Sequence, residues 1–413
     1  MPTENCGDDV AGIVPSLSKI DGNRSLRHGL LILLLAAFFV DLAASMSGLA
    51  VQFLGIKLDA STVLLGLYGT VGSTVYAVGC YFAGRTSDRF GRKLSALFLC
   101  LAGIMWMWSG LQRSPYAILV LVPLGSACLA FFWPVVQAWI GDLVPDRRQL
   151  NLVLGNFNVL WTAGLMLGPL ACGYLWGIHT LAPFVACTTI ALLTALSLMT
   201  APTRRDGTSD AALPTEHSID RYDTRADFYM PLAWLANFAS WYAGGAARTL
   251  FPKLGKEIGF SEVVIGWVMF AMLAGQLVAF LGLRRATWWH FRRLPLLVGL
   301  VIGALGMAEA ARASTPLSFA LALAVVGAAN GFTYVASLFY SLQAPTSDRG
   351  RRAGIHEAII GAGLATGPLV GGVLGSIYDL RLTFAAGALV FALVLLVEVA
   401  LWVRHRACSP KPA

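Results

Sequence analysis

The sequence predicts an all-α membrane protein whose twelve transmembrane helices form two pseudo-symmetric six-helix bundles. Three observations predict this class. The chain of 413 residues is 57% hydrophobic and only 13% charged, and its apolar runs reach the roughly 20 residues that a helix needs to cross a bilayer. Lys and Arg gather in every second connection between these runs, and one glycine pattern occurs twice, starting at Gly155 and at Gly354.

The apolar runs place the expected helices in order along the chain. They cover residues 29–51, 62–83, 94–111, 116–139, 152–176, 182–200, 228–250, 262–283, 295–311, 317–340, 353–377 and 383–403. An even number of crossings leaves both chain ends on the same side of the membrane.

The cations show which side that is. Most of the 30 Lys and Arg residues lie in the two tails and in the connections near residues 84, 146, 204–225, 284–293 and 349–352. The exceptions are Lys57, Arg113, Lys253, Lys256, Arg312, Arg381 and, inside the seventh span, Arg248. Because cytoplasmic loops carry the excess of Lys and Arg, both termini are expected in the cytoplasm, at the plasma (inner) membrane.

The longest polar connection divides the spans six and six. We expect a cytoplasmic tail at 1–28, a first bundle at 29–200, a cytoplasmic linker at 201–227, a second bundle at 228–403 and a cytoplasmic tail at 404–413. A parallel duplication of six spans is a known transporter architecture.

Several function classes are excluded. The net charge of +8 follows membrane orientation, so no nucleic-acid partner is expected. The seven cysteines are scattered without a CxxC motif or a Cys/His cluster, which predicts neither a metal site nor a disulfide framework. No phosphate-binding glycine loop is present, so ATP-driven transport is not expected. We expect a protein that is not an enzyme and has no cofactor, with a proton gradient as its energy source.

The stretch Gly84–Lys93 reads Gly-Arg-Thr-Ser-Asp-Arg-Phe-Gly-Arg-Lys between two apolar runs. Its order resembles the loop between the second and third helices of the major facilitator superfamily of secondary transporters. The resemblance covers nearly the whole chain and implies two six-helix bundles around a central cavity that works by alternating access.

The same stretch suggests a cytoplasmic gate. Asp88 is expected to accept hydrogen bonds from the amino end of the eleventh helix near Gly354, while Arg92 pairs with Asp142 at the end of the fourth span. Such bonds could form only when the two halves meet on the cytoplasmic side, so they would latch the outward-facing state. The alternative is a basic loop that only obeys the charge rule. The residues assigned to the gate are Gly84, Asp88, Arg89, Gly91, Arg92 and Asp142.

A glycine-proline motif of the same superfamily occurs in the fifth and eleventh spans. The residues are Gly155, Gly164, Gly168 and Pro169 in the fifth, and Gly354, Gly363, Gly367, Pro368, Gly371 and Gly372 in the eleventh. Glycines four apart share a helix face and let another helix approach closely, and each proline removes a backbone hydrogen bond. The pattern predicts two pliable helices that bend during gating; ordinary small-residue packing is the alternative.

Charges inside spans are candidates for proton coupling. Asp41 lies halfway along the first span, where a carboxylate costs about 2.5–3.5 kcal/mol on insertion scales. It is expected to bind and release a proton, or else to form a fixed salt bridge with Arg248. Glu357 and His356 begin the eleventh span and are a second candidate pair, unless Glu357 only pairs with Arg351 or Arg352. Glu309 and Glu398 lie near span ends, where we expect them to reach water.

Aromatic and amide side chains are dense in the middle of the spans. The residues expected to wall a substrate cavity are Arg248, Trp133, Gln137, Asn156, Asn158, Trp161, Asn237, Trp241, Tyr242, Asn330 and Tyr334. Many aromatics in a bundle only pack or form the interfacial belt. An apolar, π-rich wall suits a small amphipathic organic solute.

Because the motif occupies the fifth span, the chain is most similar to twelve-span drug–proton antiporters, although Leu121–Gly125 lacks the arginine usual there. The prediction is a monomeric secondary transporter that exports such a solute in exchange for protons. Two alternatives stay open: uptake of a sugar or organic anion by symport or uniport, with Arg248 binding a carboxylate, and a non-transporting sensor or lipid-handling relative.

Overall fold

The computed structural model describes residues 24–144, 147–203, 225–284, 286–343 and 346–408. Within these ranges the chain is built from helices without strands, as predicted. The helices of the first half are α2 (Arg24–Lys57), α3 (Thr62–Phe90), α4 (Leu94–Gly110), α5 (Pro115–Ala130), α6 (Trp133–Leu143), α7 (Arg147–Ile178) and α8 (Ala182–Thr200). Those of the second half are α9 (Arg225–Glu257), α10 (Glu262–Leu283), α11 (Arg293–Arg312), α12 (Pro316–Leu342), α13 (Thr346–Ile377) and α14 (Arg381–Cys408).

These helices make twelve crossings, because α5 and α6 together form one interrupted span. Ten spans are long and apolar enough to cross a membrane by themselves. The other two are α4, which is apolar but has 17 residues, and α9, which has 33 residues but carries more polar side chains. The protein is therefore an integral, multi-pass membrane protein.

The fourth span differs from the prediction of one continuous helix over 116–139. α5 ends at Ala130, and Phe131 and Phe132 form a tight turn in which their N–H groups donate to the carbonyls of Cys128 and Leu129. The cause is Pro134, at the start of α6: it has no N–H for the carbonyl of Ala130, and its ring would clash with that carbonyl in a continuous helix.

The basic stretch also differs from the prediction, which treated Gly84–Lys93 as a loop. α3 continues to Phe90, and the turn consists only of Gly91 to Lys93. Gly91 ends the helix because it adopts φ 88°, a left-handed conformation that favours glycine, while its N–H donates to the carbonyl of Ser87 at 2.9 Å. The charged residues before Gly91 are thus held on a rigid helical extension.

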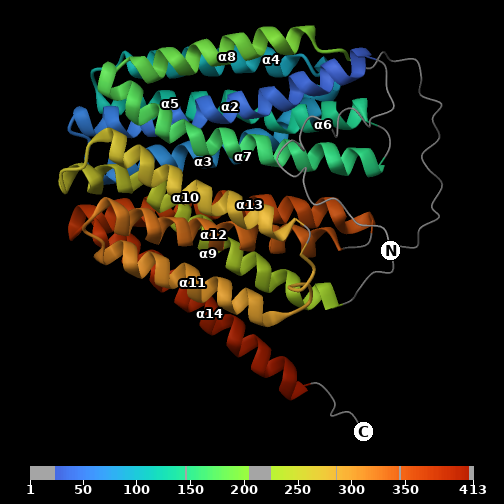
Figure 1. Cartoon of the computed structure of the whole chain (residues 1–413), viewed down its shortest axis with the longest axis vertical. Helices are drawn as coiled ribbons and strands as arrows, with labels where there is room; N and C mark the ends of the chain where they lie inside the picture. The colour runs from blue at the N-terminus through green and yellow to red at the C-terminus, as the bar shows by residue number, and fades with distance from the viewer. Residues whose placement is uncertain (1–23, 145–146, 204–224, 285, 344–345, 409–413) are drawn as a thin grey trace, which may run out of the picture.

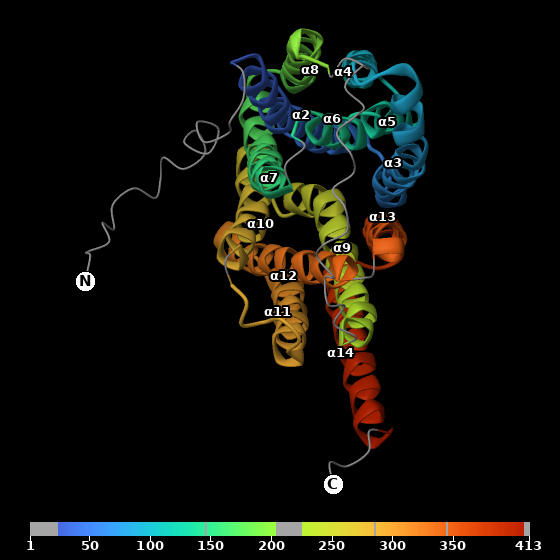
Figure 2. The ribbon, with the colours of Figure 1, turned by 90° about the vertical axis from the view of Figure 1, so that its right-hand side faces the viewer.

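The two halves of the chain lie one above the other in Figure 1, with α2 to α8 in the upper part and α9 to α14 in the lower part. Within the halves, α2 packs on α7 and α9 packs on α13. Between the halves, α3 packs on α13 and α7 packs on α10, as Figure 2 shows end-on. We call the side where α2 begins and α14 ends the termini face, and the side where α2 ends and α3 begins the opposite face.

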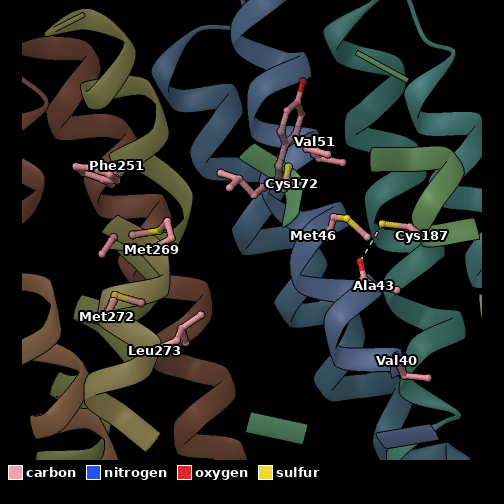
Figure 3. Close-up of a cluster of buried hydrophobic side chains, with 14 of the residues drawn as sticks. Val40, Ala43, Met46, Val51, Cys172, Cys187, Phe251, Met269, Met272 and Leu273 are labelled. Carbon is pink, nitrogen blue, oxygen red and sulfur yellow. Dashed lines mark hydrogen bonds between the residues drawn. The ribbon is translucent and has the colours of Figure 1, made fainter. Parts of the chain in front are cut away.

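The buried core runs through both halves. Figure 3 shows Met46 of α2 beside Cys187 of α8, with Met269 and Met272 of α10 across the interface. The Cys187 thiol donates to the carbonyl of Ala43 at 3.1 Å. Helices in lipid are held together by close packing and such interhelical bonds, because lipid tails are as apolar as the side chains themselves.

Candidate functional site

A cavity of about 370 Å³ lies between the two halves. Its wall comes from α2, α3, α4, α5 and α7 of the first half and from α9, α10 and α13 of the second. The polar side chains on this wall are mostly hydroxyls, including Ser45, Ser73, Tyr76, Ser109 and Ser126. The wall of the cavity is therefore mixed in polarity, mostly apolar with scattered hydrogen-bonding groups.

Arg248 of α9 supplies the one charged side chain among the residues that line this cavity. Its guanidinium lies 5.4 Å from the centre of the Trp241 ring, and its NH2 nitrogen donates to Gln276 at 3.4 Å. The Nε atom is buried and has no partner in the protein. This arrangement places a fixed, incompletely paired positive charge at the cavity.

Asp41 lies one helical turn from the cavity residue Ser45 on α2, towards the termini face, and is only 8% exposed. It interacts electrostatically with Arg248 and with the cavity residue Tyr76. No ion pair within 4.0 Å joins Asp41 to Arg248 among the described residues, so the direct salt bridge considered as an alternative is not formed in this structure.

His356 and Glu357 of α13 face different surroundings although they are neighbours. His356 is fully buried, with Nδ1 2.7 Å from the Ser337 hydroxyl and its ring 5.1 Å from Tyr334. Glu357 is exposed and interacts electrostatically with Tyr76 of α3. Arg352, one of its suggested partners, instead donates to Asp227 of α9 at 2.8 Å.

The other residues expected to wall the cavity lie elsewhere. Trp133, Gln137, Asn156, Asn158, Trp161, Asn237, Trp241, Tyr242, Asn330 and Tyr334 are not among the residues that line it. Five of the aromatic residues near it instead form a row of ring contacts across the interface, with centroid distances of 5.5–6.5 Å: Trp133, Trp161, Phe280, Tyr334 and Trp241. Asn237 and Asn330 are buried inside the second half. These residues lie on helix faces that turn away from the cavity, and a single sequence does not show which face of an apolar helix points inward.

Sequence reasoning missed the hydroxyl-bearing wall of the first half. The signal was present on α3, where Gly69, Gly72, Ser73 and Tyr76 are spaced three or four apart and therefore share one helix face.

Two equivalent crossings join the halves near the opposite face. A Cβ atom added to Gly266 of α10 would lie 2.6 Å from the carbonyl oxygen of Pro169, and one added to Gly66 of α3 would meet the carbonyl oxygen of Pro368. The motif prolines of α7 and α13 thus offer their carbonyls to a glycine of the other half. The Thr70 hydroxyl adds a hydrogen bond to the carbonyl of Ala365 at 2.8 Å.

The remaining motif glycines divide into two groups. Gly164 and Gly168 face α2, and Gly363 and Gly367 face Tyr242 of α9, so they pack within their own halves. Gly371 contacts Thr383 and Leu250, whereas Gly372 lies against Thr62 and Gly66 of the first half. Gly155 and Gly354 have no neighbour within 4 Å that an added Cβ would meet. Close packing explains the inner glycines and leaves the first glycine of each motif unexplained.

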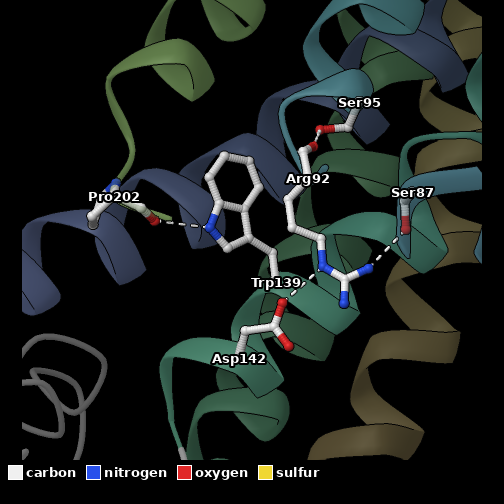
Figure 4. A network of polar contacts seen from close by, with 6 residues as sticks. All are labelled: Ser87, Arg92, Ser95, Trp139, Asp142 and Pro202. Atoms are coloured by element: carbon white, nitrogen blue, oxygen red, sulfur yellow. Dashed lines mark hydrogen bonds and ion pairs between the residues drawn. The ribbon is translucent and has the colours of Figure 1, made fainter. Parts of the chain in front are cut away.

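An ion pair on the termini face links the turn between α3 and α4 to α6. The Arg92 Nε donates to Asp142 at 2.7 Å and its NH1 donates to Ser87 at 2.8 Å, while the Trp139 indole donates to the carbonyl of Pro202 (Figure 4). The pair between Arg92 and Asp142 is the one anticipated from the sequence. Both residues belong to the first half, however, so the idea that this bond needs the two halves to meet is wrong.

The acid of the Gly84–Lys93 stretch is Asp88. The surroundings of Gly84 and the side chains of Arg85 and Asp88 lie outside what the structure describes, so the expected contact between Asp88 and α13 stays a prediction. Arg89 is exposed and lies 5.4 Å from the Phe90 ring.

Comparison with known proteins decides the family. The model of the Major Facilitator Superfamily matches residues 33–223 and 233–412. The chain belongs to this superfamily. It is 25% identical over 396 residues to multidrug resistance protein MdtG of Klebsiella pneumoniae (strain 342), covering 91% of this chain and 94% of that protein. It is 26% identical over 405 residues to the multidrug efflux pump Tap of Mycolicibacterium fortuitum, covering 90% and 95%.

Solved structures show the same fold. A bacterial homologue of the human lysosomal transporter Spinster, inward-facing and occupied, superposes with a TM-score of 0.76 at 16% identity over 95% of this chain and all of that one. The nucleoside transporter NupG gives a TM-score of 0.67 at 11% identity. The chain is a membrane transporter of this superfamily and not an enzyme.

Proposed function

We propose that this member of the superfamily is a secondary transporter that exports a small amphipathic organic solute in exchange for protons, by alternating access. The observation that carries the proposal is the cavity between the halves, with apolar walls, hydroxyls and a buried carboxylate one turn away. The relatives named for multidrug resistance and efflux match nearly the whole chain and support the same direction of transport.

In this proposal Asp41 is the proton carrier. A carboxylate buried at the centre of a membrane bundle, without a cation in direct contact, is stabilised by binding a proton. Arg248 and Tyr76, which interact with Asp41 electrostatically, both line the cavity. A change of charge on Asp41 therefore changes the electrostatic potential at the cavity where the solute binds. Glu357, exposed near Tyr76, is a secondary proton-coupling candidate.

The packing of the halves indicates which state the structure represents. The crossings at Gly66 and Gly266, together with the hydrogen bond from Lys253 to the carbonyl of Ala60 at 3.4 Å, hold the halves together near the opposite face. With both termini in the cytoplasm, we assign this arrangement to an inward-facing state. We further propose that the transporter is a monomer and is located in the plasma membrane.

The experiment uses purified protein in proteoliposomes with ethidium as an amphipathic probe and pyranine to report internal pH. Ethidium movement against its gradient should start when a proton gradient is imposed and should be matched by proton movement in the opposite direction. Equal ethidium movement with and without the gradient would overturn the proton coupling.

A second function is supported by one observation. Arg248 is the charged group that faces the cavity, and a guanidinium binds carboxylates and sulfonates well. The second candidate function is therefore uptake of an organic anion together with protons. Accumulation of an anionic probe, driven by an inward proton gradient and absent for ethidium, would favour this second function.

A further inference from the structure

A seam of buried polar side chains runs lengthwise through the second half, between α9 and α12. From the termini face inward it contains Trp234 and Ser341, then Ser337 and His356, then Asn237, then Ser240 with Thr333 and Asn330, and finally Trp241, Gln276 and Arg248 next to the cavity. On α12 these positions are three or four residues apart and therefore form one face of the helix.

Hydrogen bonds connect parts of this seam across helices. The Trp234 indole donates to the Ser341 hydroxyl at 2.9 Å, and the Ser337 hydroxyl lies 2.7 Å from Nδ1 of His356. Deeper in the bundle, the Thr333 hydroxyl donates to the Ser240 hydroxyl at 2.9 Å. Other polar atoms of the seam have no hydrogen-bond partner in the protein.

The polar atoms of the seam that lack a partner are buried. All but one of the buried side-chain nitrogen and oxygen atoms without a hydrogen bond in the described part of the chain belong to the second half. Those on the seam are Nδ2 and Oδ1 of Asn237, Nε1 of Trp241, Nε of Arg248, Nε2 of Gln276, Oδ1 of Asn330 and Nε2 of His356. The exception in the first half is Oε1 of Gln52.

A buried polar atom without a hydrogen bond destabilises the folded protein. Several such atoms close together therefore suggest that one kind of ligand binds to all of them. The group includes donors, such as the indole of Trp241 and the amide nitrogen of Gln276, and acceptors, such as Oδ1 of Asn330. Internal water is the small ligand that accepts from the first kind and donates to the second, and it needs two to four polar partners at each site. Isolated defects of packing would not gather both donors and acceptors in one part of the second half.

We propose that this seam binds a file of internal water molecules that leads from His356 to the cavity and gives the transporter a second proton-binding site at His356. His356 is suited to this position because Ser337 holds Nδ1, while Nε2 is buried without a partner in the protein. Protons reach His356 from the cavity along this file, and the positive charge of Arg248 disfavours hydronium at its mouth, which limits how fast they enter.

The groups around His356 allow it to act on the gate. On its own helix and across to α9 lies the pair of Arg352 and Asp227, and α12 presents Tyr334. Glu357, with Tyr76 and Cys80 of α3, lies on the side towards the first half. The contact of α13 with α14 at Thr383 and Gly371 is about four turns away. A charge on His356 therefore acts on the helix that carries Pro368 across the interface.

The water file is tested separately from transport. In X-ray hydroxyl-radical footprinting of the full-length protein in lipid nanodiscs, Trp241 should be labelled about tenfold faster than Trp139, because water next to a side chain is the source of the radical. Trp139 is the reference: it is also buried, at 0% exposure against 6% for Trp241, but its indole donates to the carbonyl of Pro202. Equal and slow labelling of both indoles would overturn the proposal.

Two variants test what the file does, and this part rests on the proposed proton coupling. Thr333→Val removes the link to Ser240, and Asn330→Leu removes an unpaired amide; each should slow proton movement on the pyranine signal about tenfold while ethidium binding is unchanged. Thr162→Val is the matched control, because that hydroxyl is also fully buried and bonds only within its own helix. His356→Gln should flatten the pH dependence of transport in a way that Thr162→Val does not.

The outcomes separate the two proposals. If wild-type ethidium movement ignores the proton gradient, the proposed function fails, whereas labelling of Trp241 still reports on the water file. If coupling is present but Thr333→Val, Asn330→Leu and His356→Gln all behave like Thr162→Val, the seam has no part in it. Should Asn330→Leu not fold, the isosteric Thr333→Val and the footprinting of the wild type decide.

Discussion

The crossing of α7 and α10 offers a direct way to bias the state of the transporter. In Gly266→Ala the new Cβ would lie 2.6 Å from the carbonyl oxygen of Pro169, where backbone meets backbone and no flexible side chain can yield. The helices must separate. Overpacking of this kind costs about 1–3 kcal/mol, and about 2 kcal/mol changes an equilibrium roughly thirtyfold. A closed population at the opposite face that exceeds the open one by about 30 to 1 would become nearly even.

The assay is the distance between spin labels at His179 and Glu257, which are exposed near the ends of α7 and α9 on the opposite face. Double electron–electron resonance should show the short distance of the wild type giving way to a second, longer one in Gly266→Ala. Gly66→Ala, at the equivalent crossing with Pro368, should act in the same direction.

The controls are Gly155→Ala and Gly354→Ala. Both add the same methyl group to α7 and α13 and gain the same helix propensity, but neither Cβ meets an atom within 4 Å. A distance distribution in Gly266→Ala that matches these two controls would refute the argument that the glycine is needed for closure.

Three further predictions concern the termini face and the cavity. Asp142→Asn should lower stability by at most about 1 kcal/mol, because the pair with Arg92 is partly exposed, and should leave the distances between the halves unchanged because it lies within one half; a shifted distance distribution would contradict this. Asp88→Asn should slow ethidium transport while leaving ethidium binding nearly intact, and unchanged turnover would remove Asp88 from the gate. Arg248→Gln should weaken binding of the anionic probe anilinonaphthalene sulfonate about tenfold or more in a fluorescence titration, since hydrogen bonds to charged groups contribute about 1.5–3 kcal/mol; an unchanged affinity would mean that Arg248 does not contact the solute.

Much of the fold was predictable because lipid leaves few options. Apolar length and the need to pair every backbone group indicate helices, and loop charge suggests their direction. The break at Phe131 and Phe132 had a signal in Pro134, which removes a helical hydrogen bond, but α7 and α13 continue through Pro169 and Pro368, so a proline alone does not tell a bend from a break. The extension of α3 to Phe90 was harder to see, because charged residues can continue a helix beyond the hydrocarbon as well as form a loop.

The site was less predictable, because composition does not orient a helix whose faces are all apolar. Arg248 lines the cavity as expected, whereas Trp241, Asn237 and Asn330 turn into the second half. Glu398, expected to reach water, is only 2% exposed and keeps one oxygen without a partner. Its place on α14 near the chain end suggested solvent, but burial depends on packing against neighbouring helices that the sequence does not specify.

The connection after α10 shows the same limit. The segment before α11 folds inward on aromatic contacts: Trp289 is buried, and the His290 ring stacks on Phe339 at 4.1 Å. Burial lowers the pKa of the His290 imidazole, so this side chain is neutral at physiological pH. This connection, expected to carry cytoplasmic cations, is therefore a packed end of the second half.

The most direct test of the account is proton-driven transport by Asp41→Asn in proteoliposomes. Asparagine has the size of aspartic acid but cannot exchange a proton, so ethidium should still bind and equilibrate down its own gradient. Movement against that gradient, and the pyranine signal that accompanies it, should be lost. If Asp41→Asn still concentrates ethidium at the expense of the proton gradient as the wild type does, proton coupling through Asp41 is wrong.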